Sequence, residues 1–208
     1  MHVSRLSLRR VNNIERQIAL HRDEIVEVVK QDDGAAFLQF KTGERSAELR
    51  DFFEFYLDDQ PLISIIGNFY WDGTTTIDSA FFNSKVGCLG SFGRFWDEVY
   101  IKILLQQELT EKQCQSLLTM FEPNFVNEQD ALAEQGIRNL IIKNMIDDFL
   151  FYRCQACGDG ACGGITLNIV RTADKITWTD NEKIKIHFDF NQYKEVLLRY
   201  LKENYNGK

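Results

Sequence analysis

The stretch YRCQACGDGACGG (residues 152–164) holds the residues of this chain best suited to metal binding or thiol chemistry. It contains Cys154, Cys157 and Cys162 among four glycines. A structural zinc ion takes four ligands in a tetrahedron, commonly cysteine sulfur and histidine nitrogen. The C-x-x-C spacing of Cys154 and Cys157 brings two thiols to one point, and Cys162 would be a third ligand.

The fourth ligand is missing from the stretch itself, because no second C-x-x-C and no H-x-x-x-H pair is present in the sequence. His187, Asp159 and Cys88 are the candidates, and each would have to be brought close by folding. Zinc is the one cofactor that this pattern indicates. The hypothetical ligand set is Cys154, Cys157, Cys162 and His187.

Two other interpretations of the cysteines stay open. A redox pair needs a thiol of lowered pKa, usually at a helix N-terminus. Here Cys157 is followed by Gly-Asp-Gly and then by a strand pattern, so a helix dipole is not expected. The simplest interpretation is a glycine-rich connection between two strands that carries small buried thiols.

Patterns for catalysis are weak elsewhere in the chain. The sequence lacks G-x-S-x-G, and none of its three histidines adjoins a nucleophile signature. The segment GCLGSFG (87–93) lacks the Gly-Lys-Ser/Thr ending of a P-loop. The Asp-Asp doublets lie at expected turns or element ends, where neighbouring carboxylates rarely converge on one ion. No catalytic residue is identified, and the sequence favours a protein that is not an enzyme.

Composition indicates a water-soluble globular protein with an acidic surface. The chain has 208 residues, 44% hydrophobic and 26% charged, with a net charge of −7. A chain of this length can bury a core without a metal or disulfide. Its one compact basic group, Arg5, Arg9 and Arg10, is too small to indicate nucleic-acid binding. The acidity favours a protein partner with a basic surface.

Cellular location follows from what the sequence lacks. It has no run of 18 apolar residues, so a membrane-spanning helix is not expected. The N-terminal MHVSRLSLRR is too short and too charged to resemble a secretory signal. Five cysteines, an odd number, suit reduced thiols. We therefore expect a cytoplasmic protein without membrane attachment.

The N-terminal half of the chain mixes helical and strand patterns. Ile14, Ile18, Ile25 and Val29 have helical spacing and predict one helix over residues 11–30. The next segments predict a strand at 35–40, a strand at 49–58 that ends at Asp58-Asp59, and a short helix at 61–66 that Gly67 ends. An irregular loop is expected over 68–93.

The middle of the chain is predicted to be helical. Helical spacing covers 94–108 and 127–143. Between them, Thr110 and Gln113 have the spacing of a capping box, which would start another helix that closes before Pro123.

The C-terminal third is predicted to be mostly β-structure. A strand at 147–154 leads into the cysteines, a hairpin follows at 164–180, and an alternating strand occupies 183–190. Asn191 would cap a terminal amphipathic helix. The predicted class is α+β, with a helical middle section packed on a C-terminal antiparallel sheet with a terminal helix. We expect one domain over 1–208, with a soft division near 123.

The segments CGDGACGGITLNIV, Trp178 and HFDFNQYKEVLLRYL carry a resemblance to a known group of proteins. Their order is a Cys-Gly knuckle, a β-hairpin with a tryptophan on its second strand, and a strand followed by a helix. This pattern resembles that of a family of uncharacterised bacterial proteins, and FYLDDQPLISII is similar to that family's strand–turn–helix. The resemblance implies the fold of the C-terminal third and no established activity.

Acidity, size and weak catalytic motifs together favour one functional hypothesis. The chain would be a non-enzymatic interaction protein, of an immunity or inhibitor type. The alternative is a zinc-binding or thiol-dependent enzyme that uses Cys154, Cys157 and Cys162.

Overall fold

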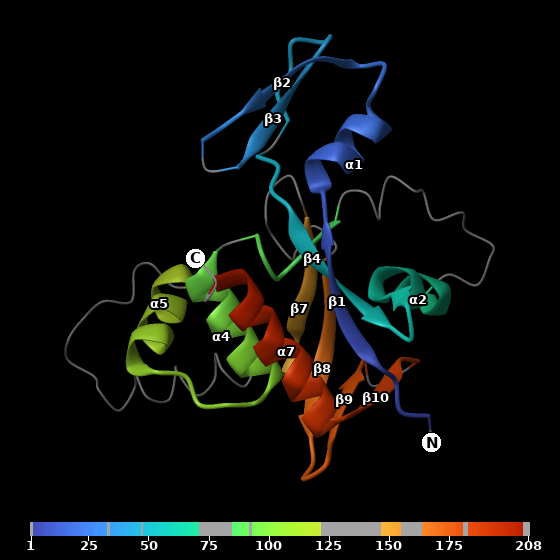
Figure 1. The fold of residues 1–208 in the computed structure, drawn as a ribbon, viewed down its shortest axis with the longest axis vertical. Helices are drawn as coiled ribbons and strands as arrows, with labels where there is room; N and C mark the ends of the chain where they lie inside the picture. Colours follow the sequence, from blue (N-terminus) through green and yellow to red (C-terminus); the bar gives the residue numbers. More distant parts are fainter. Residues whose placement is uncertain are drawn as a thin grey trace.

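A computed structural model describes residues 2–32, 34–46, 48–70, 85–91, 93–121, 147–154, 164–180 and 183–205 (Figure 1). Helices and antiparallel strands both contribute, as the predicted α+β class requires. The helices are α1 (Asn13–Leu20), α2 (Leu62–Tyr70), α4 (Arg94–Leu104), α5 (Glu111–Phe121) and α7 (Phe190–Tyr205). The strands are β1 (Leu6–Val11), β2 (Ile25–Lys30), β3 (Ala36–Phe40), β4 (Phe52–Leu57), β5 (Gln60–Pro61), β6 (Lys85–Gly87), β7 (Phe149–Cys154), β8 (Ile165–Arg171), β9 (Lys175–Thr179) and β10 (Lys185–Asp189).

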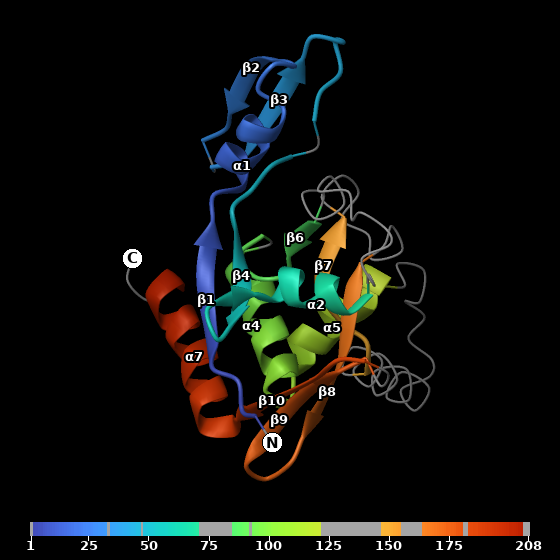
Figure 2. The ribbon, with the colours of Figure 1, turned by 90° about the vertical axis from the view of Figure 1, so that its right-hand side faces the viewer.

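Two sheets form the body of the molecule, and backbone hydrogen bonds join them at two places. The strand orders are β1-β4-β5 and β10-β9-β8-β7-β6. Phe53 N–H donates to the carbonyl of Leu89, just after β6, at 2.9 Å. At the other margin, Ser4 N–H donates to the carbonyl of His187 on β10 at 2.8 Å. The sheets therefore form one curled surface around a common core (Figure 2).

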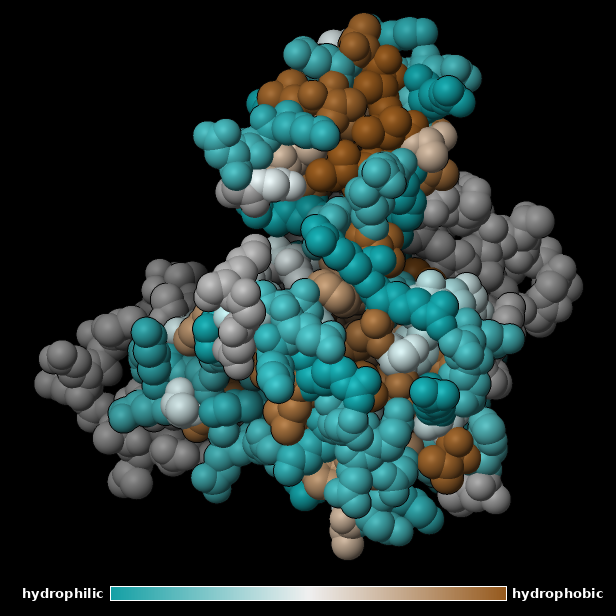
Figure 3. All heavy atoms as spheres, viewed as in Figure 1, coloured by the Kyte–Doolittle hydropathy of each residue, from teal (hydrophilic) through white to brown (hydrophobic). Residues whose placement is uncertain are grey.

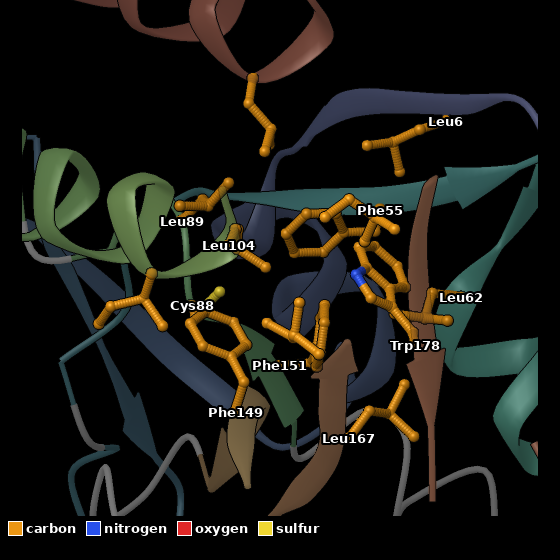
Figure 4. Packing of buried hydrophobic residues seen from close by; sticks show 14 of the residues in the cluster. Leu6, Phe55, Leu62, Cys88, Leu89, Leu104, Phe149, Phe151, Leu167 and Trp178 are labelled. Atoms are coloured by element: carbon orange, nitrogen blue, oxygen red, sulfur yellow. The ribbon is translucent and has the colours of Figure 1, made fainter. Parts of the chain in front are cut away.

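Aromatic rings fill the centre of this curled sheet. Trp178 of β9 is fully buried and lies 4.5 Å from the ring of Phe151 and 4.6 Å from that of Phe188, centroid to centroid. Figure 4 shows Phe55 of β4 beside it. The indole N–H of Trp178 donates to the hydroxyl of Tyr193 on α7 at 3.2 Å, so this buried donor has a partner. The core thus ties β4, β7, β9, β10 and α7 together.

Asp97 of α4 fixes the C-terminal helix to the body. It is fully buried, and its carboxylate accepts hydrogen bonds from the Gly90 amide at 3.0 Å and from the hydroxyl of Tyr205 at 2.7 Å. The hydroxyl of Tyr200 on α7 also donates to it. Burial raises the pKa of Asp97, while these donors oppose the shift. One side chain therefore holds together α4, the Leu89–Gly90 segment and the end of α7.

Residues 13–40 build a unit that projects beyond the body, here called the hairpin unit (Figures 1 and 2). The predicted helix over 11–30 is wrong: α1 ends at Leu20 and β2 begins at Ile25. Residues Ile25, Val26, Val28 and Val29 are β-branched, which favours a strand, and β3 is available to pair with them. The spacing of Ile25 and Val29 relative to Ile14 and Ile18 of α1 suits a continued helix, but the same residues also suit a strand. The spacing alone therefore does not distinguish a helix from a strand.

Several local predictions are confirmed. The strands at 35–40, 49–58 and 147–154 and the hairpin at 164–180 correspond to β3, β4, β7 and the β8–β9 pair. The capping box forms at α5: the Thr110 amide donates to Gln113 Oε1 at 3.0 Å, and the Gln113 amide donates to Thr110 Oγ1 at 3.3 Å.

Other predictions differ from the structure or lie outside the described residues. Helix α2 passes through Gly67 to Tyr70. Helix α7 begins at Phe190, and the Asp189 carboxylate, rather than Asn191, accepts from the Gln192 amide. Strand β6 lies within the predicted loop 68–93. The predicted helix 127–143 and the division near 123 lie outside the described residues.

We predict that Asp97→Ala lowers the free energy of unfolding by roughly 3 kcal/mol, because it leaves buried tyrosine and amide donors without an acceptor. Urea unfolding followed by tryptophan fluorescence measures this change. Glu98→Ala is the matched control: Glu98 pairs with Arg94 at the surface, 2.7 Å away, and its loss should cost about 0.5 kcal/mol or less. Equal effects of the two substitutions would contradict the role of Asp97.

Candidate functional site

The cysteine stretch connects two neighbouring strands, as predicted. Strand β7 ends at Cys154, whose backbone is opposite Lys85 of β6. Strand β8 begins at Ile165, opposite Tyr152 of β7. Cys157 and Cys162 lie outside the described residues. The chain leaves the sheet on β7 and re-enters it on the adjacent strand β8.

The structure does not bring His187 to this connection. His187 is opposite Thr177 of β9, which is opposite Val170 of β8. It therefore lies three strands from β7 and at the other end of the sheet from Cys154. With strands about 4.8 Å apart and about 3.3 Å per residue, both offsets exceed 10 Å, whereas zinc ligands lie about 2.0–2.3 Å from the metal.

Contacts of His187 fit a sheet residue. Its Nδ1 lies 2.9 Å from the hydroxyl of Thr177, and its backbone carbonyl accepts from Ser4. Partial burial and the charges of Lys185 and Lys175 lower its pKa. It stabilises the junction between β10 and the N-terminal segment.

Cys88, the second candidate ligand, lies in the core. It is 4% exposed, and its amide donates to the Phe151 carbonyl at 3.1 Å. Burial and the nearby charge of Asp97 raise the pKa of its thiol, which keeps it protonated and a poor metal ligand. Among the described residues, no group of three or more His, Cys, Asp or Glu side chains could hold a metal ion. Asp159 lies outside that range.

A buried polar cluster that the sequence analysis missed lies next to β6 and β7. The hydroxyl of Tyr152 donates to the carboxylate of Glu54 on β4. Arg16 of α1 donates from Nη2 to the carbonyl of Lys85 at 3.0 Å and lies over the ring of Phe52, 5.1 Å from its centroid. The cluster therefore joins α1, β4, β6 and β7.

Glu54 is the carboxyl group of this cluster, and its pKa is strongly altered. Burial raises its pKa from 4.5 to about 7, against the opposing effects of the Tyr152 hydrogen bond and the Arg16 charge. A carboxyl with such a pKa can serve as an acid or base when a substrate reaches it. Glu54 is only 5% exposed and is enclosed by its partners. Its position therefore fits a role in joining the hairpin unit to the body.

The hairpin unit carries the clearest accessible feature of the described chain. Val26 is 63% exposed, Leu20 45% and Val29 36%. These three residues, here called the hairpin surface, make up half of the six large hydrophobic residues that are exposed in the described chain. Figure 3 shows hydrophobic residues gathered over β2 and β3, whereas the body below is largely hydrophilic on this face.

A hollow of about 330 Å³ lies in the hairpin unit, between the turn after α1 and the end of β3. The ring of His21 packs edge-on against Phe40 with 5.6 Å between centroids, and His21 Nδ1 lies 3.2 Å from Glu24. Its charged lining is mostly acidic: Asp23, Glu24 and Glu44 against Lys41. The hairpin unit thus offers an apolar surface together with an acidic recess.

No protein-family model matches the chain, and neither a curated protein nor a solved structure shows significant similarity to it. Within the described ranges, none of the helices combines the length and the apolar character that crossing a bilayer requires. The functional argument therefore depends on the geometry of this chain.

We predict that Glu54 makes folding stability depend on pH. Its pKa is higher in the folded chain than its ordinary value, so folding takes up a proton between pH 4.5 and about 7. Stability is then fully present below 4.5 and falls by roughly 3 kcal/mol as pH rises through this window. Glu54→Gln should remove the part of the decline that Glu54 causes, so stability should fall clearly less between about pH 5 and about pH 8 than in the unchanged chain; the raised pKa of Asp97 leaves a smaller decline of the same sign.

Urea unfolding at a series of pH values measures the effect. Glu27→Gln is the matched control, because Glu27 is exposed on β2 and its loss should leave the decline in place. An unchanged pH profile in Glu54→Gln would show that Glu54 is not the titrating group.

Proposed function

We propose that this chain is a non-enzymatic protein-interaction protein, of an immunity or inhibitor type, that binds its partner through the hairpin unit. The observation that supports the proposal is the hairpin surface, with Val26 63% exposed on β2 of a projecting unit. Large exposed apolar patches on soluble proteins commonly mark interaction sites.

The construction of the hairpin unit supports this role. A two-stranded hairpin is marginally stable by itself, and here Ala36 and Leu38 of β3 are buried, as is Leu49, which follows the unit in the sequence. The isolated bridge between Ala36 and Leu49 adds support on the outer side of β3. The side chains of Val26 and Val29 face solvent and do not contribute to this buried set. Their burial by a partner would gain about 25 cal/mol for each Å² removed from water.

Charge indicates the partner. The chain carries a net charge of −7, and the recess beside the hairpin surface is lined by Asp23, Glu24 and Glu44. A lysine or arginine of the partner would find carboxylates and the ring of Phe40 there. We therefore propose a protein partner with a basic surface, met in the cytoplasm, and no nucleic-acid or membrane ligand.

We predict that Val26→Asp weakens partner binding at least tenfold, because it puts a charge into the apolar contact. The measurement is quantitative pulldown from extract of the source cells, with mass spectrometry to identify the protein and titration of the purified pair. Val170→Asp is the matched control: Val170 is 50% exposed on β8, away from the hairpin unit, and its substitution should leave binding unchanged.

Association with a basic partner should also slow as salt concentration rises, because screening weakens electrostatic steering. A partner that binds Val26→Asp as well as the unchanged chain would contradict the proposed surface. Association that does not depend on salt would contradict the proposed charge complementarity.

A zinc knuckle is the second candidate function. The supporting observation is that the cysteine connection is anchored at both ends, at Cys154 beside Lys85 and at Ile165 beside Tyr152. Cys154, Cys157 and Cys162 remain the proposed ligands, and the position of His187 leaves the fourth ligand to be found elsewhere. Such a knuckle would stabilise the β7–β8 connection or supply a thiol-dependent activity.

We predict about one zinc ion per chain in protein purified without chelators, as measured by elemental analysis, and its loss in Cys157→Ser. The matched control is Cys114→Ser on α5, far along the chain from the connection and half-buried. Metal-free protein, or equal zinc in both variants, would return the cysteines to the interpretation as small structural thiols.

A further inference from the structure

The outer edge of β1 is an open edge of the sheet. Strand β1 is the first of its sheet and pairs with β4 on one side only. Just before β1, the amide of Ser4 donates to the carbonyl of His187 on β10. Beyond this bond, β10 no longer runs beside β1, because the chain leaves β10 and continues as α7, which lies beside β1 in both ribbon views (Figures 1 and 2). A gap in the strand pairing therefore remains between β1 and α7.

The register shows which backbone groups face this gap. Asp58 N–H donates to the carbonyl of Arg5, so residues 5, 7, 9 and 11 direct their backbone groups toward β4. Residues 6, 8 and 10 direct theirs outward. The carbonyl of Leu6 agrees with this parity, because it accepts from Gln192 of α7 at 3.0 Å. Among the described residues, the outward groups of Leu8 and Arg10 have no hydrogen-bond partner.

A groove of about 380 Å³ lies along this open edge. Its apolar lining comes from Leu6, Leu8, Phe53, Val196 and Tyr200. The rings of Phe53 and Tyr200 meet edge-on with 4.6 Å between centroids. Tyr200 is held in turn by Asp97. A volume of this size is within the range of ligand-binding clefts, and its walls are fixed by the core.

Exposed arginines lie on both faces of β1. Leu6 and Leu8 point toward the core and α7, and Arg10 shares their parity, whereas Arg5 and Arg9 lie on the opposite parity and are also exposed. Arg5 lines the groove, and no ion pair involving it occurs in the described part of the chain. On the α7 wall, Glu195 pairs with Arg199 and Glu203 also lines the groove, so Arg5 is the cation that the β1 wall presents. Arg9 is paired with the exposed Asp59.

We infer that this groove binds an extended, mainly apolar peptide segment of another protein, which pairs with the outer edge of β1 and carries one Asp or Glu that meets Arg5. Backbone pairing would satisfy the amide and carbonyl of Leu8, as in other peptides that add a strand to a sheet edge. The apolar residues would meet Leu8, Val196 and Tyr200, away from Glu203 on the α7 wall. This surface is separate from the hairpin surface.

Selection from a displayed library of random twelve-residue peptides, with the full chain as target, tests the inference. The best binder is synthesised with a fluorophore, and its dissociation constant is measured by anisotropy. We expect a mainly apolar sequence with one Asp or Glu that binds at micromolar concentration or tighter. Recovery of no peptide that binds below about 100 μM would overturn the inference.

Two variants locate the bound peptide. Leu8→Pro removes the outward amide without touching the bonds to β4, and it should weaken binding about fivefold or more. Arg5→Glu should weaken it at least tenfold by reversing the charge that meets the peptide. Arg22→Glu is the matched control, an exposed arginine on the hairpin unit. If circular dichroism shows that Leu8→Pro does not fold, the peptide affinity of Arg5→Glu relative to the unchanged chain tests the inference by itself.

Equal binding to the unchanged chain and to Arg5→Glu would overturn the inference. So would a loss of binding in Val26→Asp, because the peptide would then occupy the hairpin surface. Light scattering of the free chain gives a further outcome. A dimer that Leu8→Pro dissociates would assign the edge to a second copy of this chain and overturn the peptide assignment.

Discussion

Closure of the curled sheet at its two margins is the constraint on which the rest of the structure depends. The bonds Phe53–Leu89 and Ser4–His187 convert two sheets into one surface that encloses Trp178 and its aromatic neighbours. Without them, β1 and β4 would form a ribbon attached to the body only through side chains. Backbone pairing at this second margin stops at Ser4, so the outer edge of β1 stays open beside α7. The enclosed core and the groove at this edge are therefore both consequences of the same sheet topology.

Polar groups are buried where separate elements meet. Asp97 joins α4 to α7, and Glu54 with Tyr152 and Arg16 joins the hairpin unit to β4 and β7. Buried polar groups are costly unless they are paired, so each of these clusters specifies one arrangement of its elements. The hairpin unit differs, because its valines face solvent on an element that contributes little to the main core. The molecule thus has a rigid body and a projecting unit whose surface is suited to contact.

Much of the fold could be predicted from the sequence, because the C-terminal strands alternate and one side of each faces a single core. The pairing of β8 with β9 and the Thr110–Gln113 box follow from local patterns alone. Local patterns failed where tertiary structure decides. Ile25 and Val29 suit a helix or a strand equally. The alternation in β4 predicts that Glu54 lies on an exposed polar face, but in the fold the adjacent α2 covers that face. The cysteines were correctly placed between two strands, whereas His187 has the right chemistry but lies on a distant strand. The hairpin surface could not be predicted, because exposure of Val26 is a property of the assembled fold.

The position of β1 has a consequence for how the protein folds. This strand and the segment before it are contacted by residues far along the chain: the Ser4 amide donates to the His187 carbonyl, and the Gln192 side chain donates to the Leu6 carbonyl. Contacts of such long sequence separation slow folding, because the intervening chain must be ordered first. Strand β1 can pair with β4 early, whereas its contacts with β10 and α7 form late. Until α7 has docked, β1 is more exposed than in the folded chain, and it is then a segment that a chaperone would shield.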